Sequence, residues 1–170
     1  HEFFNIERFI FIGSDRQIQN RTAIIKLIKI WENENLEFNL HIFGKMFHKY
    51  NFSNKKVIFE GYVEDLSDCY RQNSVLINLT TISGGIKIKT IQAISRGIPV
   101  IGFKNAFEGL PSEINLYNLI SNEDVISFIK SKNINNLLLE QHKIQNKIGK
   151  KILCKEAIIN NWRRLLNFNE

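Results

Sequence analysis

A glycine pair followed by two lysines is the part of this sequence best suited to bind an anion. The segment SGGIKIK, residues 83–89, leads into a helical pattern. The first turn of a helix carries unpaired N–H groups and a partial positive charge, so a lysine there is disfavoured by about 0.3–1 kcal/mol. A phosphate would offset this cost, because glycines allow close approach and N–H groups at a helix start hold phosphate oxygens. The predicted phosphate-binding residues are Ser83, Gly84, Gly85, Ile86, Lys87 and Lys89.

A simpler interpretation of the same segment stays open. The two glycines could only form a tight turn, with both lysines in solvent. The chain has neither a Walker A sequence nor a GxGxxG fingerprint, so no established phosphate-binding motif supports the first interpretation.

Short apolar segments alternate with helical patterns along the chain, which is typical of a parallel sheet covered on both faces. The predicted strands are residues 8–13, 38–44, 56–61, 74–80 and 98–103, with a short sixth at 115–120. The predicted helices are residues 20–34, 64–72 with Asp65 as its cap, 122–132, and one or two from about residue 136, with Gly149 as the place of a break if there are two. We predict an α/β fold, a Rossmann-like parallel sheet of about six strands with helices on both faces. Ligands bind beyond the carboxyl ends of such strands, where residues 80–85 lie.

Length and composition indicate one ordinary globular domain over residues 1–170. The chain is 44% hydrophobic and 24% charged. No apolar run approaches the roughly 20 residues of a membrane span, and the first residues have neither a basic start nor a cleavable apolar region. We therefore expect a cytoplasmic protein. Cys69 and Cys154 lack Cys or His neighbours at metal-ligand spacing, so we expect reduced, packed thiols and no metal site.

The basic balance of the chain, +6 with a pI near 9.3, invites comparison with nucleic-acid-binding proteins. Its lysines are dispersed through the sequence, which favours a solvated surface, and we expect no nucleic-acid partner. A weak attraction to phosphates or to anionic lipid headgroups is compatible with this charge. Peripheral contact with the inner face of a membrane is therefore left open.

The segment from Ser83 to Gly102 resembles the signature of the C-terminal domain of GT-B glycosyltransferases, above all the retaining, family 4-like group 1 enzymes that use nucleotide sugars. The matching positions are Gly85, Lys87, Lys89, Ala93, Gly97, Pro99 and Val100. The segments 11–24, 57–70 and 107–110 also look like segments of this family, in the same order. The resemblance covers about residues 8–130.

The resemblance implies the donor-binding half of a two-domain enzyme, with the N-terminal acceptor-binding domain absent. The implied activity is metal-independent transfer of a hexose from a UDP- or GDP-sugar to a polysaccharide or lipid-linked acceptor, without a cofactor. The glycine loop would hold the donor diphosphate, and Lys87 and Lys89 would act in catalysis by neutralising charge on the leaving nucleotide. Tyr62 and Val63 would meet the nucleoside. The chain alone is expected to be inactive.

Some positions depart from the family pattern. Gln92 stands where the family has a glutamate that binds the ribose, and Gly84 where it has a glutamate that contacts the sugar. A neutral hydrogen bond contributes about 0.5–1.5 kcal/mol, against roughly 1.5–3 for a charged one. With Asn20 aligned to the family, Arg16 and Arg21 each follow the usual basic positions by two residues. Either arginine could reach the phosphates, or both could be surface charges.

Other interpretations follow from these departures. A non-catalytic GT-B-like partner subunit is the nearest alternative to an enzyme. A nicotinamide-binding or receiver module is disfavoured, because the GxGxxG sequence and an acidic cluster after the early strands are both missing. We expect His41 and His48 to be structural or solvated, because no acid or nucleophile pairs with either in the sequence. Trp162 is expected in the core or at a domain interface.

Overall fold

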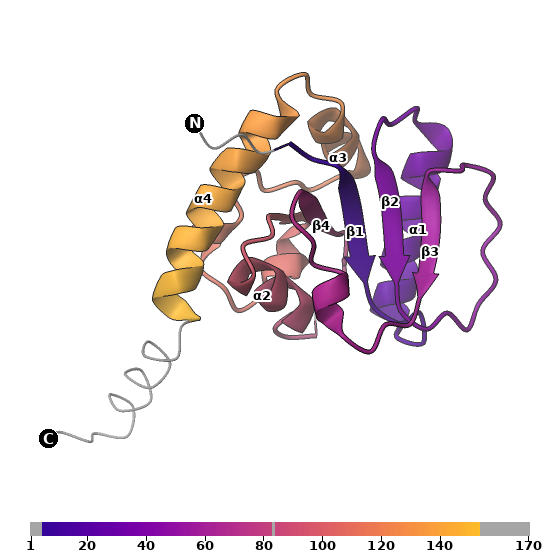
Figure 1. The fold of residues 1–170 in the computed structure, drawn as a ribbon, viewed down its shortest axis with the longest axis horizontal. Helices are drawn as coiled ribbons and strands as arrows, with labels where there is room; N and C mark the ends of the chain where they lie inside the picture. The colour runs from indigo at the N-terminus through magenta and orange to yellow at the C-terminus, as the bar shows by residue number, and fades with distance from the viewer. Residues whose placement is uncertain (1–4, 83, 154–170) are drawn as a thin grey trace, which may run out of the picture.

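A five-stranded parallel sheet forms the centre of the computed structural model, which describes residues 5–82 and 84–153. The strands are β1 (Arg8–Ile12), β2 (Asn39–Phe43), β3 (Val57–Gly61), β4 (Ser74–Asn78) and β5 (Val100–Gly102). They lie side by side in the order β3-β2-β1-β4-β5. Figure 1 shows the arrows of β1, β2 and β3 pointing the same way. All carboxyl ends of the strands therefore meet at one edge of the sheet.

The predicted sixth strand is wrong. Residues 115–120 make only an isolated parallel bridge between Phe103 and Leu119. The outward backbone groups of Val100, at the start of β5, are already bonded: Val100 N–H donates to Gln145 Oε1 at 2.8 Å, and Gln145 Nε2 donates to Val100 O at 2.7 Å. Because a further strand would need these same groups, the sheet ends at β5.

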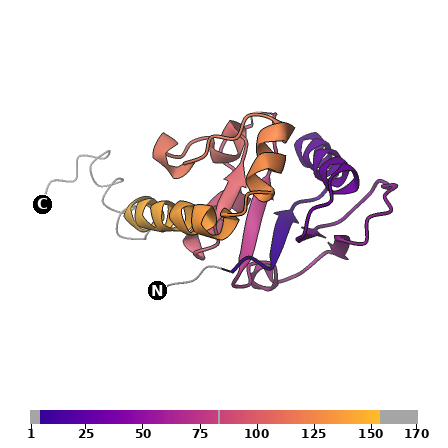
Figure 2. The ribbon, with the colours of Figure 1, turned by 90° about the horizontal axis from the view of Figure 1, so that it is seen from above.

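Helices cover both faces of the sheet, as predicted. Strand residues alternate between two apolar cores, with Phe9 and Phe11 in one and Ile10 and Ile12 in the other. Helices α1 (Ile18–Asn33) and α3 (Asn122–Ile129) pack in the first core, and Figure 2 shows them on the same side of the sheet. Helix α2 (Ile88–Ser95) and the 3₁₀ turn η1 (Leu66–Asp68) pack in the second.

The long helix α4 (Ile134–Ile152) begins close to its predicted start and is not broken at Gly149. Gly149 is buried, and a Cβ there would lie 2.7 Å from Ile94 Cγ2. The glycine therefore allows α4 to pack closely on α2. Cys154 and Trp162 lie outside the described residues. None of the described helices combines the length and apolarity needed to cross a membrane.

Side chains cap the starts of α3 and η1, and of these two caps only Asp65 was predicted. Ser121 and Asp124 form a reciprocal capping box at the start of α3. The Asp65 side chain accepts a hydrogen bond from Ser67 N–H at 2.8 Å, although the helix that it begins is only the short η1. Helix α2 differs, because its N-cap residue is Lys87 and makes no side-chain cap. The charge at this helix start must be balanced in another way.

Candidate functional site

The candidate site lies at the carboxyl ends of β1 and β4, where the strand order of the sheet reverses direction. Strand β1 pairs with β2 on one side and with β4 on the other. The chain from β1 leads through α1 to β2, whereas the chain from β4 leads through α2 to β5. The loops that follow β1 and β4 therefore face each other across the switch point of the sheet, the place where parallel α/β sheets bind ligands.

Lys89 connects the two helices that follow these loops, α2 and α1. Its ammonium donates to Asn20 Oδ1 at 2.8 Å and lies 4.0 Å from the centroid of the Phe11 ring. The Asn20 amide is oriented by its own donation to Ser14 O at 2.9 Å. Burial, and then the charge of Lys87, lower the pKa of Lys89 to about 7. A neutral amide and an aromatic ring compensate this ammonium only in part, so a bound anion would stabilise its charged form.

Lys87 balances its charge against a carboxylate from a distant loop. Its ammonium donates to Glu108 Oε2 at 3.2 Å and to Gly85 O at 2.5 Å. Glu108 Oε2 also accepts the N–H groups of Gly84 at 3.3 Å and Gly85 at 3.0 Å. The N–H groups predicted to hold phosphate therefore hold this carboxylate. Of the other predicted residues here, Ser83 lies outside the described part of the chain and Ile86 is exposed.

Glu108 has no role that its sequence position alone predicts. It follows the 3₁₀ turn η2 (Lys104–Phe107), 24 positions after Gly84, and reaches the glycine loop because β4 and β5 are neighbours. Its segment resembles the family pattern, and that resemblance is the only signal that could have found it. Gln92, the predicted ribose-binding residue, lies on α2 about one turn beyond Lys89 and is half-buried.

A cavity at the carboxyl ends of β1, β2 and β3 brings together Arg16, Tyr62 and Val63. Its volume is about 350 Å³, and Phe47 also lines it. The Arg16 guanidinium lies 5.0 Å from the Phe47 ring centroid, and Lys45 Nζ lies 4.5 Å from that of Tyr62. Three predicted residues from two loops thus share one cavity with aromatic walls and positive charge, a combination suited to a nucleoside and its phosphates.

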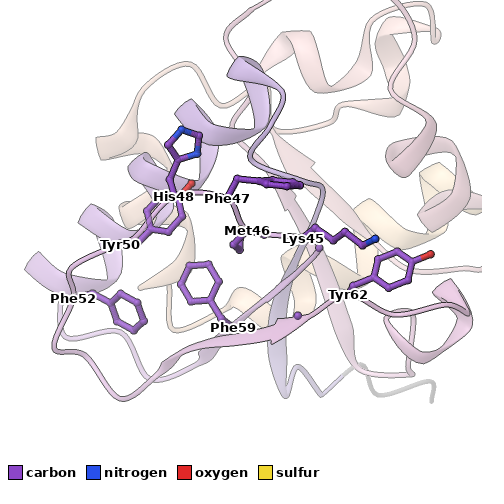
Figure 3. A pocket seen from close by; sticks show the side chains of 10 residues that line it. Lys45, Met46, Phe47, His48, Tyr50, Phe52, Phe59 and Tyr62 are labelled. Carbon is purple, nitrogen blue, oxygen red and sulfur yellow. The ribbon is translucent and has the colours of Figure 1, made fainter.

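A larger aromatic cavity of about 580 Å³ lies beside the first and shares Phe47 and Tyr62 with it. Figure 3 shows the rings of Tyr50, Phe52 and Phe59 gathered on one side of it. The ring centroids of Tyr50 and Phe52 lie 5.5 and 5.4 Å from that of Phe59. This cavity was not predicted from the sequence, because its rings come from a loop and an edge strand without a regular spacing.

A buried carboxylate fixes the loop that separates the two cavities. Asp15 is fully buried and accepts hydrogen bonds from Phe47 N–H at 2.7 Å, His48 N–H at 2.9 Å, His48 Nδ1 at 3.1 Å and the Tyr50 hydroxyl at 2.9 Å. Burial alone would raise the pKa of Asp15, but these hydrogen bonds outweigh it and lower the pKa. Asp15 therefore ties the loop after β1 to the loop after β2.

The expectation that neither histidine pairs with an acid is wrong. His48 bonds Asp15, and His41 Nδ1 lies 2.5 Å from Glu60 Oε1. These partners are 33 and 19 positions away, so the register of neighbouring strands was needed to find them.

The two candidate arginines are placed differently. Arg16 lines the smaller cavity, whereas Arg21 NH1 lies 2.7 Å from His48 Nε2. Since His48 Nδ1 faces the Asp15 carboxylate, Nε2 is the ring atom left to accept a hydrogen bond from the Arg21 guanidinium. The structure thus groups Arg16 with Tyr62 and Val63, and Arg21 with the Asp15–His48 pair.

Among the described residues, no group of three or more His, Cys, Asp or Glu side chains is arranged to hold a metal ion.

Comparison with known proteins identifies the family of this chain. The model of the family named glycosyl transferases group 1 matches residues 7–138. The chain belongs to the group 1 glycosyltransferases. A comparison of its sequence with curated proteins finds no match.

Solved glycosyltransferase structures share the fold of this group 1 chain. TarM of S. aureus, solved as a mutant with fondaparinux, α-GlcNAc-glycerol and UDP, superposes with a TM-score of 0.63 at 18% identity, over 98% of this chain and 37% of TarM. The pneumococcal O-GlcNAc transferase GtfA, solved with UDP and GlcNAc, gives 0.61 at 16% identity, over 98% of this chain and 38% of GtfA. HepE of Anabaena, with UDP and glucose, gives 0.70 at 12% identity, over 95% of this chain and 48% of HepE. This group 1 chain thus spans less than half the length of each.

Proposed function

We propose that this chain is the donor-binding half of a glycosyltransferase that takes a hexose from a UDP- or GDP-sugar. One observation carries the proposal: a nucleoside-sized cavity with Arg16, Tyr62 and Val63 lies on the same sheet edge as Lys89, which connects the two helices that follow the loops of the switch point. A nucleoside diphosphate has the matching parts, an aromatic base and a short anionic chain.

In this proposal, Tyr62 and Val63 contact the nucleoside while Arg16 and Lys89 meet the diphosphate. Transfer of the sugar leaves a nucleoside diphosphate whose negative charge grows as the bond breaks. Positive groups fixed in advance at that place lower the barrier, because they need no rearrangement during the reaction. We assign this neutralisation to Lys89 and Lys87 rather than to a metal ion. Gln92 is the candidate for contact with the ribose.

The acceptor and the other half of the enzyme are also matters of proposal. TarM, GtfA and HepE were each solved with UDP, which favours UDP over GDP as the leaving group here. We propose a polysaccharide or lipid-linked acceptor, bound by a separate N-terminal domain, and retention of the anomeric configuration. A cytoplasmic location, with the positively charged domain near the inner face of a membrane, fits such an acceptor.

A non-catalytic partner subunit with the same fold is the second candidate. The chain also superposes on the GtfA/B complex with a TM-score of 0.62 at 14% identity, over 96% of this chain and 36% of that chain. Gln92 supplies a neutral group where a glutamate is usual in the family, which favours weaker donor binding. A partner subunit would keep the fold and bind no nucleotide.

Titration with UDP and GDP, followed by NMR, distinguishes the two candidates. For the enzyme half we expect chemical-shift changes at the backbone amides of Arg16, Tyr62, Val63 and residues 84–89, and no sugar transfer by the chain alone. Changes confined to distant amides would contradict the proposed site. No binding of either nucleotide would favour the partner subunit.

A further inference from the structure

The strand order arranges the loops of the site in a row. Tyr62 follows β3, Phe47 follows β2, Arg16 follows β1, Gly84 follows β4 and Glu108 follows β5. Since neighbouring strands lie about 4.8 Å apart, this row runs along the sheet edge from the smaller cavity to the glycine loop. A position along the row corresponds to a position along an extended ligand.

A nucleotide sugar is such a ligand, with base, ribose, diphosphate and sugar in linear order. This step rests on the function proposed above. The nucleoside lies in the cavity at the carboxyl ends of β3, β2 and β1, and the diphosphate lies at Lys89, between β1 and β4. The sugar, which follows the diphosphate, then lies at the loops after β4 and β5. The sugar of the donor would therefore lie beside Gly84, Gly85 and Glu108.

Glu108 offers a fixed acceptor at this place. Its Oε2 receives Gly84 N–H, Gly85 N–H and the Lys87 ammonium, at 3.3, 3.0 and 3.2 Å. Its side chain is 35% exposed, so a ligand on the sheet edge can reach it. Three donors on one oxygen hold the carboxylate in position before any ligand arrives, and charged acceptors form the stronger hydrogen bonds.

The charge of Glu108 decides which part of the donor fits beside it. A phosphate there would meet a like charge, and it would have to break three charge-assisted hydrogen bonds to take the place of the carboxylate. A sugar presents neutral hydroxyl groups, which donate to carboxylates. The site beside Glu108 thus favours the sugar over the phosphates.

We propose that Glu108 accepts hydrogen bonds from hydroxyl groups of the donor sugar and thereby determines which sugar is bound. Discrimination follows from geometry, because a sugar whose hydroxyl points elsewhere leaves the desolvated carboxylate without that partner. Gly84, Gly85 and Lys87 act as positioning groups for this carboxylate.

The test compares nucleotide and nucleotide-sugar binding by calorimetry. The probes are UDP, UDP-glucose, UDP-galactose and UDP-GlcNAc, each titrated into wild type, Glu108→Gln and Glu108→Asp. We expect at least one sugar to bind wild type more tightly than UDP does. Glu108→Gln should weaken binding of that nucleotide sugar by about ten-fold, the lower range for a charged hydrogen bond, and change UDP affinity by less than about two-fold.

Two controls separate recognition from loop damage. Glu113→Gln removes an exposed carboxylate from the neighbouring turn η3 (Ser112–Ile114) and should change neither affinity. Glu108→Asp keeps the charge but shortens the side chain, so it should lose the sugar preference while retaining UDP affinity. Melting temperatures of all variants check that the fold is intact.

Every other outcome overturns the assignment. An equal loss of UDP and UDP-sugar affinity in Glu108→Gln would mean that Glu108 only stabilises the glycine loop. A gain in UDP affinity in this variant would mean that the Glu108 carboxylate occupies the place of the diphosphate. An unchanged sugar preference, or no preference in wild type, would remove Glu108 from sugar recognition while UDP binding upholds the proposed function. Failure of wild type to bind UDP or GDP would overturn both.

Discussion

Lys89 Nζ lies 2.8 Å from Asn20 Oδ1, so an ammonium at the start of α2 is held by an amide at the start of α1, 69 positions earlier. Both helices follow strands that meet at the switch point of the sheet. The contact connects the starts of the two helices and leaves the charge of Lys89 opposite a neutral partner. A lysine in this position costs stability when it is charged and becomes useful when an anion binds.

The first prediction concerns stability and pH. Burial lowers the pKa of Lys89 from 10.5 to about 7, so between these pH values the unfolded chain holds a proton that the folded chain has released. The Lys89 contribution to the free energy of unfolding should therefore rise with pH across that window, and it is least favourable below about pH 7. Lys89→Met should remove this rise. Urea denaturation of both proteins at pH values of about 6, 7, 8 and 9 measures it, and identical pH slopes would contradict the prediction.

The second prediction is proton uptake on nucleotide binding. A diphosphate beside Lys89 favours the charged ammonium, so the free chain at about pH 8, where Lys89 is mostly neutral, should take up a proton as UDP binds. The affinity for UDP should fall as the pH rises from about 7 to about 9. Calorimetric titrations in HEPES and Tris buffers report the number of protons from the difference in apparent enthalpy. Lys89→Met is expected to bind UDP more weakly and without uptake; uptake that persists in this variant would assign the proton to another group.

The third prediction concerns the buried carboxylate. Asp15→Asn keeps the shape of the side chain but removes the charge that three hydrogen-bonding residues of the loop after β2 share. We expect a loss of about 1–3 kcal/mol in the free energy of unfolding, since a buried donor is left without its acceptor. Because the folded-state pKa of Asp15 is lowered, its stabilisation is present at neutral pH and should be lost as the pH falls through that value. The Asp15→Asn variant should lack this acid dependence, and Tyr50→Phe, which removes one donor, should cost only about 0.5–1.5 kcal/mol. Urea denaturation across the acid range measures both, and an acid dependence that persists in Asp15→Asn would assign it to other carboxylates.

The strands were predictable from sequence because buried parallel strands are continuous apolar runs. All five begin and end within two residues of their predicted limits. The segment at 115–120 is also largely apolar, but Val100 of β5 is bonded through its backbone to Gln141 and Gln145 of α4. Two buried glutamines on a helix give no signal in a hydrophobic pattern. The apolar runs of the sequence therefore predict the strands, whereas the number of strands in the sheet depends on tertiary contacts.

Two features of the candidate site could be predicted from the sequence: the glycine loop, and its place at the carboxyl ends of the strands. Lys87 and Lys89 were conspicuous because they conflict with the helix dipole, but their partners could not be predicted. Asn20 lies in the first turn of α1 and Glu108 directly follows η2, and no sequence periodicity selects either of these polar residues. Asp15 was equally hidden, because its hydrogen bonds reach 32 to 35 positions along the chain. These pairings require the strand order, which places the loops side by side.

The fourth prediction separates the two arginines. Arg16 lines the cavity with Tyr62, whereas Arg21 bonds His48, so Arg16→Ala should weaken UDP binding more than Arg21→Ala does. The loss for Arg16 should be about ten-fold if a charge-assisted contact to phosphate is removed. Calorimetric titration with UDP measures both variants. Uridine, which has no phosphate, should bind each variant and wild type alike. A larger effect at Arg21 would mean that ligand binding releases it from His48.

The last prediction concerns Lys87 at the N-cap of α2. Because a positive charge is unfavourable at a helix N-terminus, this position alone predicts that removal of the charge stabilises the fold. The structure predicts the opposite sign. Lys87 is paired with Glu108 Oε2 and hydrogen-bonded to Gly85 O, so Lys87→Gln should lower the free energy of unfolding, by up to about 1 kcal/mol because the pair is partly exposed.

A double-mutant cycle with Glu108→Gln isolates this pair. If the ion pair outweighs the helix dipole, the two single losses should sum to more than the loss in the double variant, since each single change already removes the interaction. Urea denaturation at low salt and at about 0.5 M salt provides the measurement, and the coupling should shrink with salt because the pair is partly exposed. A more stable Lys87→Gln protein would show that the helix dipole outweighs the Lys87–Glu108 ion pair.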